Sequence, residues 1–266
     1  MNIKPRDVLT YLAIVNQGDW HRTYQACRNW KNSEVSDEEI EKVLKTLKCQ
    51  YITILDDEYP FQLRNVHWPP LVLFYYGDIS LIKNFNRNIS VIGSRNNTEY
   101  GARMTHSIVK DICQDFNIVS GLAIGIDSIA HKAAIENGGR TIGVLGNGID
   151  FIYLKSNEEL YKEIREKHLV ISEYPNDVPA DENTFRMRNR IIAALSIALV
   201  VTEARNHSGS LITISFALQL GRDVFCVPYR ADEGSHCNVL IKEGAFLAES
   251  GDDILYELKK IPPIIK

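Results

Sequence analysis

Glycines, small hydroxyl residues and an arginine follow several short apolar stretches of this 266-residue sequence. Such residues suit a phosphate group. Glycine lets backbone amides approach an anion closely, and a guanidinium binds phosphate through a forked contact. The segments are Gly93-Ser94-Arg95, residues 120–127 with Gly121, Leu122, Ala123 and Gly125, Gly146-Asn147-Gly148, and Ser208-Gly209-Ser210. Glycine after a strand is also ordinary turn chemistry, so it is the coincidence of several segments at one sheet edge that predicts a phosphate-binding pocket.

Three arginines at alternating positions are a second candidate for phosphate binding. Arg186, Arg188 and Arg190 come directly before an apolar run that begins at Ile191. Arginines at the start of a helix oppose its macrodipole, so their charge needs a compensating partner. A phosphate backbone is one such partner, and carboxylates nearby in the sequence are the other. These carboxylates are Glu173, Asp181 and Glu182. The residue types alone leave both alternatives open.

Several other chemistries lack the residues they need. Neither the dinucleotide fingerprint G-x-G-x-x-G nor the phosphate loop G-x-x-x-x-G-K-[ST] occurs, which disfavours a nicotinamide dehydrogenase or a P-loop ATPase. Five cysteines without a C-x-x-C pair disfavour a disulfide framework and a zinc ribbon. His131 has no serine or cysteine partner at a recognisable spacing. We therefore expect no catalytic residue, no cofactor and no metal site.

Composition and charge are those of an ordinary globular protein. Hydrophobic residues make up 45% and charged residues 24%, which excludes disordered and fibrous classes. The longest largely apolar stretch, residues 191–201, is shorter than the roughly 18 residues of a membrane span, and no signal-peptide pattern is present. We expect a cytoplasmic protein without a membrane partner. The net charge is -4, but residues 186–230 hold six arginines against two acids. This asymmetry favours either a local basic patch or a salt-bridged surface.

From residue 88 onward, short apolar stretches alternate with helical stretches. The predicted strands are residues 90–92, 118–119, 141–145, 169–171, 197–201 and 224–227. They lack the polar alternation of a half-exposed strand, which indicates a parallel sheet covered by helices on both faces. We predict a Rossmann-like, doubly wound, mainly parallel α/β sheet, which binds its ligand at the carboxyl ends of the strands.

Residues 1–80 have a different pattern. Val8, Leu9 and Leu12 fall on one face of a short helix, and Ser36 with Glu39 forms a capping box for a second amphipathic helix. A segment rich in proline and aromatic residues follows over residues 59–76, and proline favours extended backbone there. We predict a small all-helical domain with an extended connector over residues 1–80, and the Rossmann-like domain over residues 81–266.

The order and spacing of these segments resemble the DNA-processing protein A family, also called DprA or Smf. The resemblance runs from about residue 59 to residue 249 and depends on the whole set of motifs. The matching segments are 91–95 with Tyr100-Gly101, 120–127 with Ala130-His131, 141–150, 171–175, 188–193, Glu203-Ala204, 208–213, Gly221-Arg222 and 224–228. The N-terminal helices fit the small sterile-alpha-motif-like (SAM-like) domain that some members of this family carry.

The resemblance implies a protein of natural transformation that binds single-stranded DNA, forms a homodimer and loads a RecA-type recombinase onto the incoming strand. It also implies that single-strand-binding protein is displaced or shares the strand. Carried over by position, the DNA-binding residues are Gly93, Ser94, Arg95, Gly121, Leu122, Ala123, Gly125, Lys155, Arg188, Arg190, Ser208, Gly209 and Ser210. Cations spaced along a groove are what a single strand requires.

The sequence departs from the family pattern at three places. Leu154 stands where the family has the proline of Tyr-Pro, and Arg186 stands where it has the proline of Phe-Pro-x-Arg. Tyr229 replaces the glycine of Val-Pro-Gly. The first two lie in expected DNA-facing loops, where Arg186 adds a cation. Only 17 residues follow Glu249, so we expect no C-terminal winged helix of the kind that many members carry.

An enzyme is the alternative function. A nucleotide-binding or phosphoribohydrolase-like protein would share the Rossmann-like fold, and fold alone does not decide function. Such an enzyme needs a glutamate inside its glycine-rich phosphate loop, whereas Glu203 precedes Ser208-Gly209-Ser210. We therefore favour the DNA-binding function. The apolar stretches 191–201 and 211–220 predict a homodimer that uses the second stretch or its neighbours.

Overall fold

The computed structural model describes residues 3–205 and 208–259, and its core is a nine-stranded sheet. The strands are β1 (Gln50–Thr53), β2 (Val72–Gly77), β3 (Asn88–Gly93), β4 (Asn117–Ser120), β5 (Thr141–Leu145), β6 (Leu169–Ser172), β7 (Ala198–Glu203), β8 (Asp223–Cys226) and β9 (Phe246–Leu247). Their order across the sheet is β1-β2-β6-β5-β4-β3-β7-β8-β9. From β6 to β9 all neighbours are parallel, whereas β1 and β2 pair antiparallel with each other and β2 pairs antiparallel with β6. The predicted Rossmann-like, mainly parallel sheet is confirmed.

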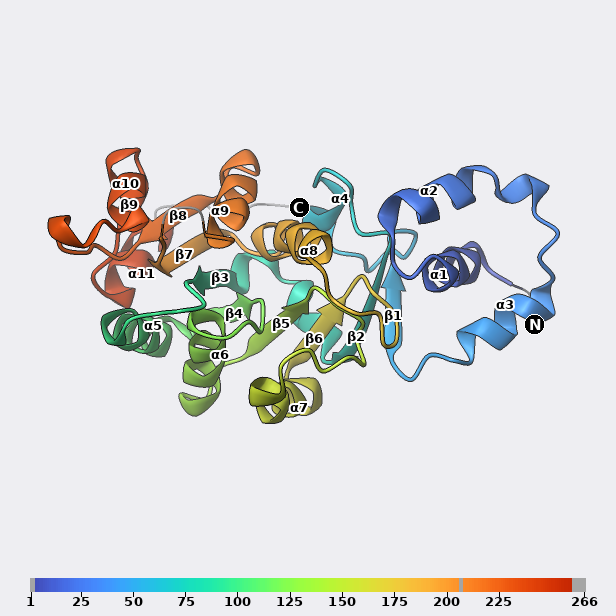
Figure 1. Cartoon of the computed structure of the whole chain (residues 1–266), viewed down its shortest axis with the longest axis horizontal. Helices are drawn as coiled ribbons and strands as arrows, with labels where there is room; N and C mark the ends of the chain where they lie inside the picture. The colour runs from blue at the N-terminus through green and yellow to red at the C-terminus, as the bar shows by residue number, and fades with distance from the viewer. Residues whose placement is uncertain (1–2, 206–207, 260–266) are drawn as a thin grey trace.

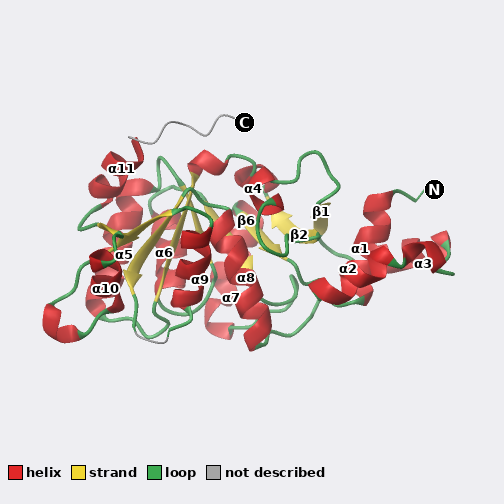
Figure 2. Ribbon diagram, turned by 90° about the horizontal axis from the view of Figure 1, so that it is seen from above, coloured by secondary structure: helices red, strands yellow, loops and turns green. Residues whose placement is uncertain are grey.

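Helices cover both faces of this sheet (Figure 1, Figure 2). They are α1 (Pro5–Val15), α2 (Trp20–Arg28), α3 (Asp37–Leu44), α4 (Phe61–Arg64), α5 (Glu99–Ile112), α6 (Ile126–Glu136), α7 (Glu158–Lys167), α8 (Glu182–Ala194), α9 (Ser210–Gln219), α10 (His236–Lys242) and α11 (Gly251–Lys259). Short 3-10 turns are η1 (Trp30–Asn32), η2 (Ile79–Ile82), η3 (Phe85–Arg87), η4 (Lys155–Asn157) and η5 (Ala231–Glu233). Within the described residues, no helix is both long and apolar enough to cross a bilayer.

The central strands are buried because successive side chains point into two different helix layers. In β3, Ile89 and Val91 pack in the core formed with α5, α6 and α11, while Ile92 packs in the core formed with α8, α9 and α10. Ser90 points to the α8 side and satisfies its hydroxyl by donating to Ile192 O at 2.8 Å. Parallel strands covered in this way need no polar face.

The first part of the chain is helical, as the sequence predicts, but the connector is not a free link. Helices α1, α2 and α3 pack around a small core of their own that includes Tyr11, Leu12 and Ile40. The segment that follows contributes β1 and β2 to the edge of the large sheet. The predicted boundary at residue 80 therefore falls after two strands that the sheet already contains. The prolines of this segment lie between β1 and β2, where their missing N–H groups interrupt no sheet pairing.

The strand order reverses beside β3. From β3 the chain proceeds through β4, β5 and β6 in one direction, and then β7 returns to pair on the other side of β3. The connections diverge at this point, which leaves a crevice at the carboxyl ends of β3 and β7.

Candidate functional site

A groove of about 670 Å³ occupies the crevice at this reversal of strand order. Its walls are the loop after β3, residues 205 and 208–210 from the end of β7 to the start of α9, and the first half of α8. Ligands of open α/β sheets bind at this position, so the groove is the candidate functional site.

The loop after β3 presents an exposed arginine on a tightly packed base. A Cβ at Gly93 would lie 2.7 Å from Ile126 Cγ1, so only glycine lets this turn pack against α6. Ser94 O accepts a hydrogen bond from Ile126 N at 3.1 Å, and Ser94 Oγ accepts one from Asn96 N at 3.1 Å. The exposed Arg95 guanidinium lies over the Phe185 ring, with Cζ 5.2 Å from the ring centroid. Within residues 3–205 and 208–259, Arg95 forms no ion pair, so its charge is available to an anion.

The loop after β4, residues 121–125, is held by hydrogen bonds from three other elements. Arg188 Nη1 donates to Gly121 O at 2.6 Å, Asn157 Nδ2 donates to Leu122 O at 3.0 Å, and Ser128 Oγ donates to Ala123 O. These bonds keep Leu122 in a left-handed backbone conformation, with φ of 56°. Strain in a non-glycine residue persists only when its surroundings enforce it, and it concentrates at binding sites.

Two glycines of this loop shape it for different reasons. A Cβ at Gly121 would collide with the Arg188 guanidinium and with the Asp127 carboxylate. Gly125 has φ of 81° and lies against the backbone of Ser94 and Arg95. Both residues position the loop rather than offer a side chain to a ligand.

The groove carries more basic than acidic side chains, and its acids are already engaged. The cations are Arg95, Arg186, Arg188 and Arg205, and the carboxylates are Asp127, Asp181 and Glu182. Asp181 caps α8 by accepting from Thr184 N at 2.7 Å, and Glu182 pairs with Arg186 at 3.2 Å. Asp127 accepts from Gly121 N at 3.1 Å. The carboxylates therefore stabilise local structure, and the excess charge of the groove is positive.

Arg188 and Asp127 are buried together beneath the floor of the groove. Burial lowers the pKa of Arg188 to about 10, although the Asp127 carboxylate opposes the change. Burial likewise raises the pKa of Asp127, and the Arg188 charge opposes that rise. Arg188 remains a cation at neutral pH. It supports the floor of the groove as well as lining it.

The start of α9 adds hydroxyl groups to the opposite wall. Ser208 and Ser210 share a hydrogen bond of 2.6 Å between their Oγ atoms, and Gly209 lies between them at the N-cap of α9. A Cβ at Gly209 would meet no atom within 4 Å, so this turn is open to the groove. Hydroxyls at a helix N-terminus are suitable donors to a phosphate oxygen.

The structure places the sequence-predicted residues at different distances from the groove. Those that line the groove are Gly93, Ser94, Arg95, Ala123, Arg188, Ser208, Gly209 and Ser210. Gly121 and Leu122 line an adjoining cavity, and Gly125 shapes the loop between the two spaces. Lys155 lies on the exposed turn η4, beside the cavity-lining residues Leu154 and Asn157, but lines neither space.

The structure does not bring Arg190 to the groove, which corrects the prediction that it flanks the pocket. Its side chain is 1% exposed, and its guanidinium grips both carboxylate oxygens of Glu173 at 2.6 Å. Arg190 Nε also donates to Trp68 O at 2.9 Å. Glu173, one of the carboxylates near these arginines in the sequence, therefore compensates the charge of Arg190.

Several residues of the site were not in the predicted set. Tyr153 and Phe185 line the groove, and their rings meet edge to face with centroids 5.2 Å apart. Arg205 adds a cation to the rim, beside Arg186, which the sequence already indicates as an added cation. The available signal was an aromatic residue in each of the two segments that depart from the family pattern, Tyr153 before Leu154 and Phe185 before Arg186. Leu154 lines the adjoining cavity.

Glu203, which the enzymatic alternative would need, does not line the groove. Its carboxylate is 3% exposed and accepts hydrogen bonds from Thr98 N at 2.8 Å and Thr98 Oγ1 at 2.9 Å. Tyr229, the third departure from the family pattern, donates to the same oxygen at 3.2 Å. Glu203 therefore fastens β7 to the start of α5. Among the described residues, no cluster of three or more histidine, cysteine and acidic side chains could hold a metal ion.

This chain is similar to known proteins in sequence, both to a family model and to individual relatives. Residues 50–259 match the family model described as DNA recombination-mediator protein A. The DNA processing protein DprA of Streptococcus pneumoniae is 44% identical over 215 residues, which cover 80% of this chain and 75% of the relative. Residues 50–259, which the family model matches, include every residue that lines the groove.

Two solved structures resemble this one over most of their length. The X-ray structure of DprA from Streptococcus pneumoniae has a TM-score of 0.83 and 36% identity, covering 97% of this chain and 99% of that one. The structure of DNA processing protein A from Helicobacter pylori, described for its single-stranded DNA binding mode, has a TM-score of 0.72 and 29% identity. That match covers 80% of this chain and 97% of the other.

Proposed function

Because this chain belongs to the DNA recombination-mediator protein A family, we propose that it binds single-stranded DNA in the groove at the ends of β3 and β7. The observation that carries the proposal is the groove itself, in which the exposed cations Arg95, Arg186 and Arg205 adjoin serine hydroxyls, the exposed ring of Tyr153 and the half-buried ring of Phe185. Arginines along a groove neutralise phosphates, and aromatic rings stack on bases. The Helicobacter pylori relative, whose described function is single-stranded DNA binding, supports the same ligand.

The biological role that we propose is recombination mediation without catalysis. In it the protein loads a RecA-type recombinase onto incoming single-stranded DNA during natural transformation, displacing or sharing the strand with single-strand-binding protein. The description of the matching family as a recombination mediator supports this role. We place the activity in the cytoplasm, consistent with the five cysteines, which are all free thiols.

The proposed functional unit is a homodimer that uses α9 or its neighbours. Leu218 on α9 is 58% exposed, so this helix has an apolar side chain available to a partner surface. A light-scattering mass near twice 30.2 kDa at micromolar concentration is expected. A mass equal to that of one chain would contradict the dimer.

The test of the function is the salt dependence of binding to a labelled oligo-dT strand, followed by fluorescence anisotropy. Affinity should fall with salt on a log-log slope of about -0.7 for each phosphate neutralised. A duplex of equal length should bind more weakly, because its second strand and stacked bases keep the aromatic rings of the groove from reaching a base. Binding that ignores salt, or that prefers duplex, would contradict the proposal.

The enzymatic alternative is tested beside it. Glu203 is engaged in fastening β7 to α5, and Glu182, the glutamate that lines the groove, pairs with Arg186, so neither supports the chemistry of a phosphoribohydrolase. We expect no release of free base from nucleoside monophosphates. Base release that is lost in Glu203→Gln would instead favour the enzyme.

A further inference from the structure

Five aromatic rings meet at the surface where α2 contacts the segment between α4 and β2. The Trp20 ring stacks on Tyr24, with centroids 5.0 Å apart and 12° between the ring planes. Trp68 lies beside both Trp20 and His21, with centroids 6.5 and 5.2 Å away. Its ring also contacts His67 at 4.3 Å. These five residues, Trp20, His21, Tyr24, His67 and Trp68, form an aromatic platform.

Most of the aromatic platform is open to solvent. Tyr24 is 46% exposed, Trp68 is 37% exposed, and both histidines are exposed as well. Trp20 is half-buried and donates from Nε1 to Pro69 O at 2.8 Å, which fixes α2 against the segment before β2. Single exposed aromatic residues are common on protein surfaces, whereas a contiguous exposed cluster is typical of a binding surface.

The backbone that carries Trp68 is strained and is held by buried groups. Trp68 has φ of 55°, a left-handed conformation that is rare for a bulky residue. Its carbonyl oxygen accepts a hydrogen bond from Arg190 Nε at 2.9 Å, and Arg190 is itself paired with Glu173. Strain of this kind persists only where the surroundings enforce it, and it concentrates at binding sites. The buried ion pair therefore helps to hold the exposed ring in place.

The aromatic platform lies at the same edge of the sheet as the groove. Because β2 is antiparallel to β6, Trp68, which precedes β2, lies beyond the carboxyl end of β6. Gly18, which precedes α2, packs at the same place, since a Cβ there would lie 2.7 Å from Glu173 O, one residue after β6. Between β3 and β6 there are three strand spacings of about 4.8 Å, so their carboxyl ends are about 14 Å apart.

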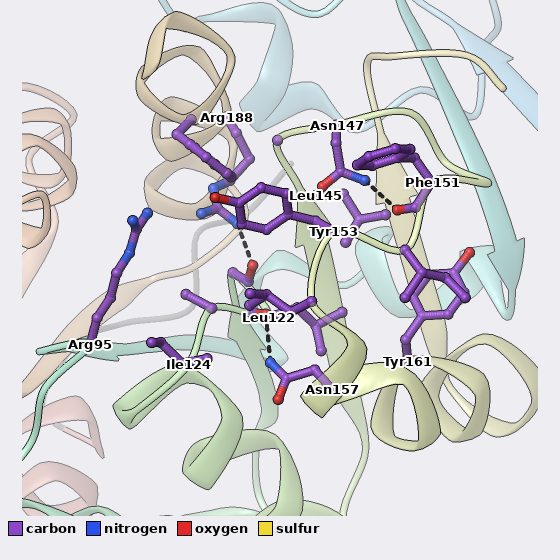
Figure 3. A pocket seen from close by; sticks show the side chains of 16 residues that line it. Arg95, Leu122, Ile124, Leu145, Asn147, Phe151, Tyr153, Asn157, Tyr161 and Arg188 are labelled. Carbon is purple, nitrogen blue, oxygen red and sulfur yellow. Dashed lines mark hydrogen bonds between the residues drawn. The ribbon is translucent and has the colours of Figure 1, made fainter. Parts of the chain in front are cut away.

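A cavity of about 120 Å³ occupies the part of this edge between the groove and the platform (Figure 3). It is lined in part by residues 121–124 and 145–147, at the carboxyl ends of β4 and β5. Figure 3 shows Arg95, which also lines the groove, on one side of this cavity and Tyr161 on the other. The groove, the cavity and the aromatic platform thus follow one another along the carboxyl edge of the sheet.

A cation extends the row of rings on α2. Trp20, Tyr24 and Arg28 are spaced four residues apart, so they lie along one face of the helix. Arg28 is exposed, and within residues 3–205 and 208–259 it forms no ion pair. A guanidinium beside exposed rings is the combination that binds a single strand, since the rings stack on bases and the cation neutralises a phosphate.

We propose that the aromatic platform stacks on bases of the single strand whose phosphates bind in the groove, so that α2 and the segment before β2 form the far end of one binding path. The inference rests on the proposed single-stranded DNA binding and adds a second contact to it. Stacking tolerates every base, because every base has a π-face. The platform should therefore add affinity without adding sequence preference.

The experiment compares oligo-dT strands of about 4 and about 16 nucleotides, the range of site sizes on single-strand-binding folds, in their affinities for the wild-type chain and two variants. Trp68→Asn removes one ring and introduces a residue type that tolerates the left-handed conformation. Tyr24→Ala removes a second ring from an exposed helical position. The gain in affinity from the longer strand should fall by about fivefold or more in each variant, in line with the loss of one stacked base. Affinity for the shorter strand, which the groove binds, should change by less than about twofold.

Tryptophan fluorescence gives a readout that a purely structural role of these rings would not change. Two of the three tryptophans, Trp20 and Trp68, belong to the platform, and the third, Trp30, lies beside Tyr11 at the small N-terminal core. A base that stacks on an indole ring quenches its fluorescence. The longer oligo-dT should therefore quench the wild-type emission more than the shorter one does, and Trp68→Asn should lose much of this extra quenching.

Tyr256→Ala is the matched control for Tyr24→Ala. Tyr256 is 65% exposed on α11 and lines neither the groove nor the cavity. This variant removes the same side chain from another exposed helix, and it should leave the gain from the longer strand unchanged.

The outcomes separate this inference from the proposed function. An equal gain in the wild-type chain, Trp68→Asn and Tyr24→Ala, with the shorter strand still bound, would overturn the DNA contact of the platform and leave the function intact. A platform that binds a protein partner would give this result. A wild-type chain that binds neither strand would overturn the proposed function itself. Melting curves identify a variant that has unfolded, and the quenching of the folded wild-type chain then decides, because no extra quenching by the longer strand would overturn the inference.

Discussion

Replacing Arg95 with alanine should weaken single-stranded DNA binding without unfolding the protein. The guanidinium makes a cation–π contact with Phe185 and no ion pair within the described parts of the chain, so the fold loses little. A contact of this kind at an exposed site contributes about 0.5–1 kcal/mol. For a chain of this length, that corresponds to a fall in melting temperature of at most about 4 °C.

The expected effect of Arg95→Ala on binding is much larger. A hydrogen bond to a charged group contributes about 1.5–3 kcal/mol, which corresponds to about a tenfold to a hundredfold loss of affinity. The salt slope should also become shallower by about 0.7, since one phosphate contact is lost.

The assay for Arg95→Ala pairs fluorescence anisotropy on labelled oligo-dT with a melting curve of the same sample. Arg103→Ala is the matched control, because Arg103 is exposed on α5 and does not line the groove. It removes the same charge and should leave affinity within about twofold. If Arg95→Ala bound DNA as the wild type does, or lost no more affinity than Arg103→Ala, the assignment of Arg95 to phosphate would be refuted.

Two further predictions concern buried ionisable groups. Arg190→Ala leaves the Glu173 carboxylate buried and unpaired, and should lower the free energy of unfolding by about 3–5 kcal/mol in urea titrations. The double variant Arg190→Met/Glu173→Leu should recover most of that loss, and no recovery would contradict the pairing. Burial lowers the pKa of His131 from 6.5 to about 3, so below pH 6.5 the unfolded chain binds a proton that the folded chain excludes. Stability should therefore fall from pH 6.5 toward pH 3, by up to about 1.4 kcal/mol per pH unit, and His131→Gln should flatten this dependence in urea titrations at several pH values. An unaltered slope would assign the dependence to other groups.

Most of the sheet could be predicted because its signal is local. Each of the six predicted strands corresponds to one of β3 to β8, since strands buried on both faces are continuous apolar runs. The three arginines were predicted to lie at the start of a helix, whereas they lie within α8. The helix begins at Glu182, where Asp181 provides the cap. β1 and β2 were missed because they join the sheet at its antiparallel edge, a pairing between distant segments that proline content obscures.

The site could be predicted in part, for a related reason. Glycine and serine at strand ends mark the groove, because the carboxyl ends of parallel strands meet at one edge. The cavity left no such mark. Leu122, Leu145 and Tyr161 belong to three separate elements and have no common sequence motif, so only the packing of the folded chain brings them together. Likewise, the sequence alone does not show which arginine faces solvent and which is paired inside the core.

The three alternating arginines illustrate this last point. Successive residues of an α-helix are rotated by about 100°, so positions two apart point in very different directions. Arg186 is exposed at the rim and pairs with Glu182. Arg188 passes under the groove to the carbonyl oxygens of Gly121 and Val144. Arg190 lies on another face, fixed to Glu173. The helix α8 thus holds the β4 loop with one arginine and β6 with another, while it offers a third to the groove. An arginine that does not contact bound DNA, such as Arg190, therefore still determines how rigidly the DNA-binding residues of α8 are held.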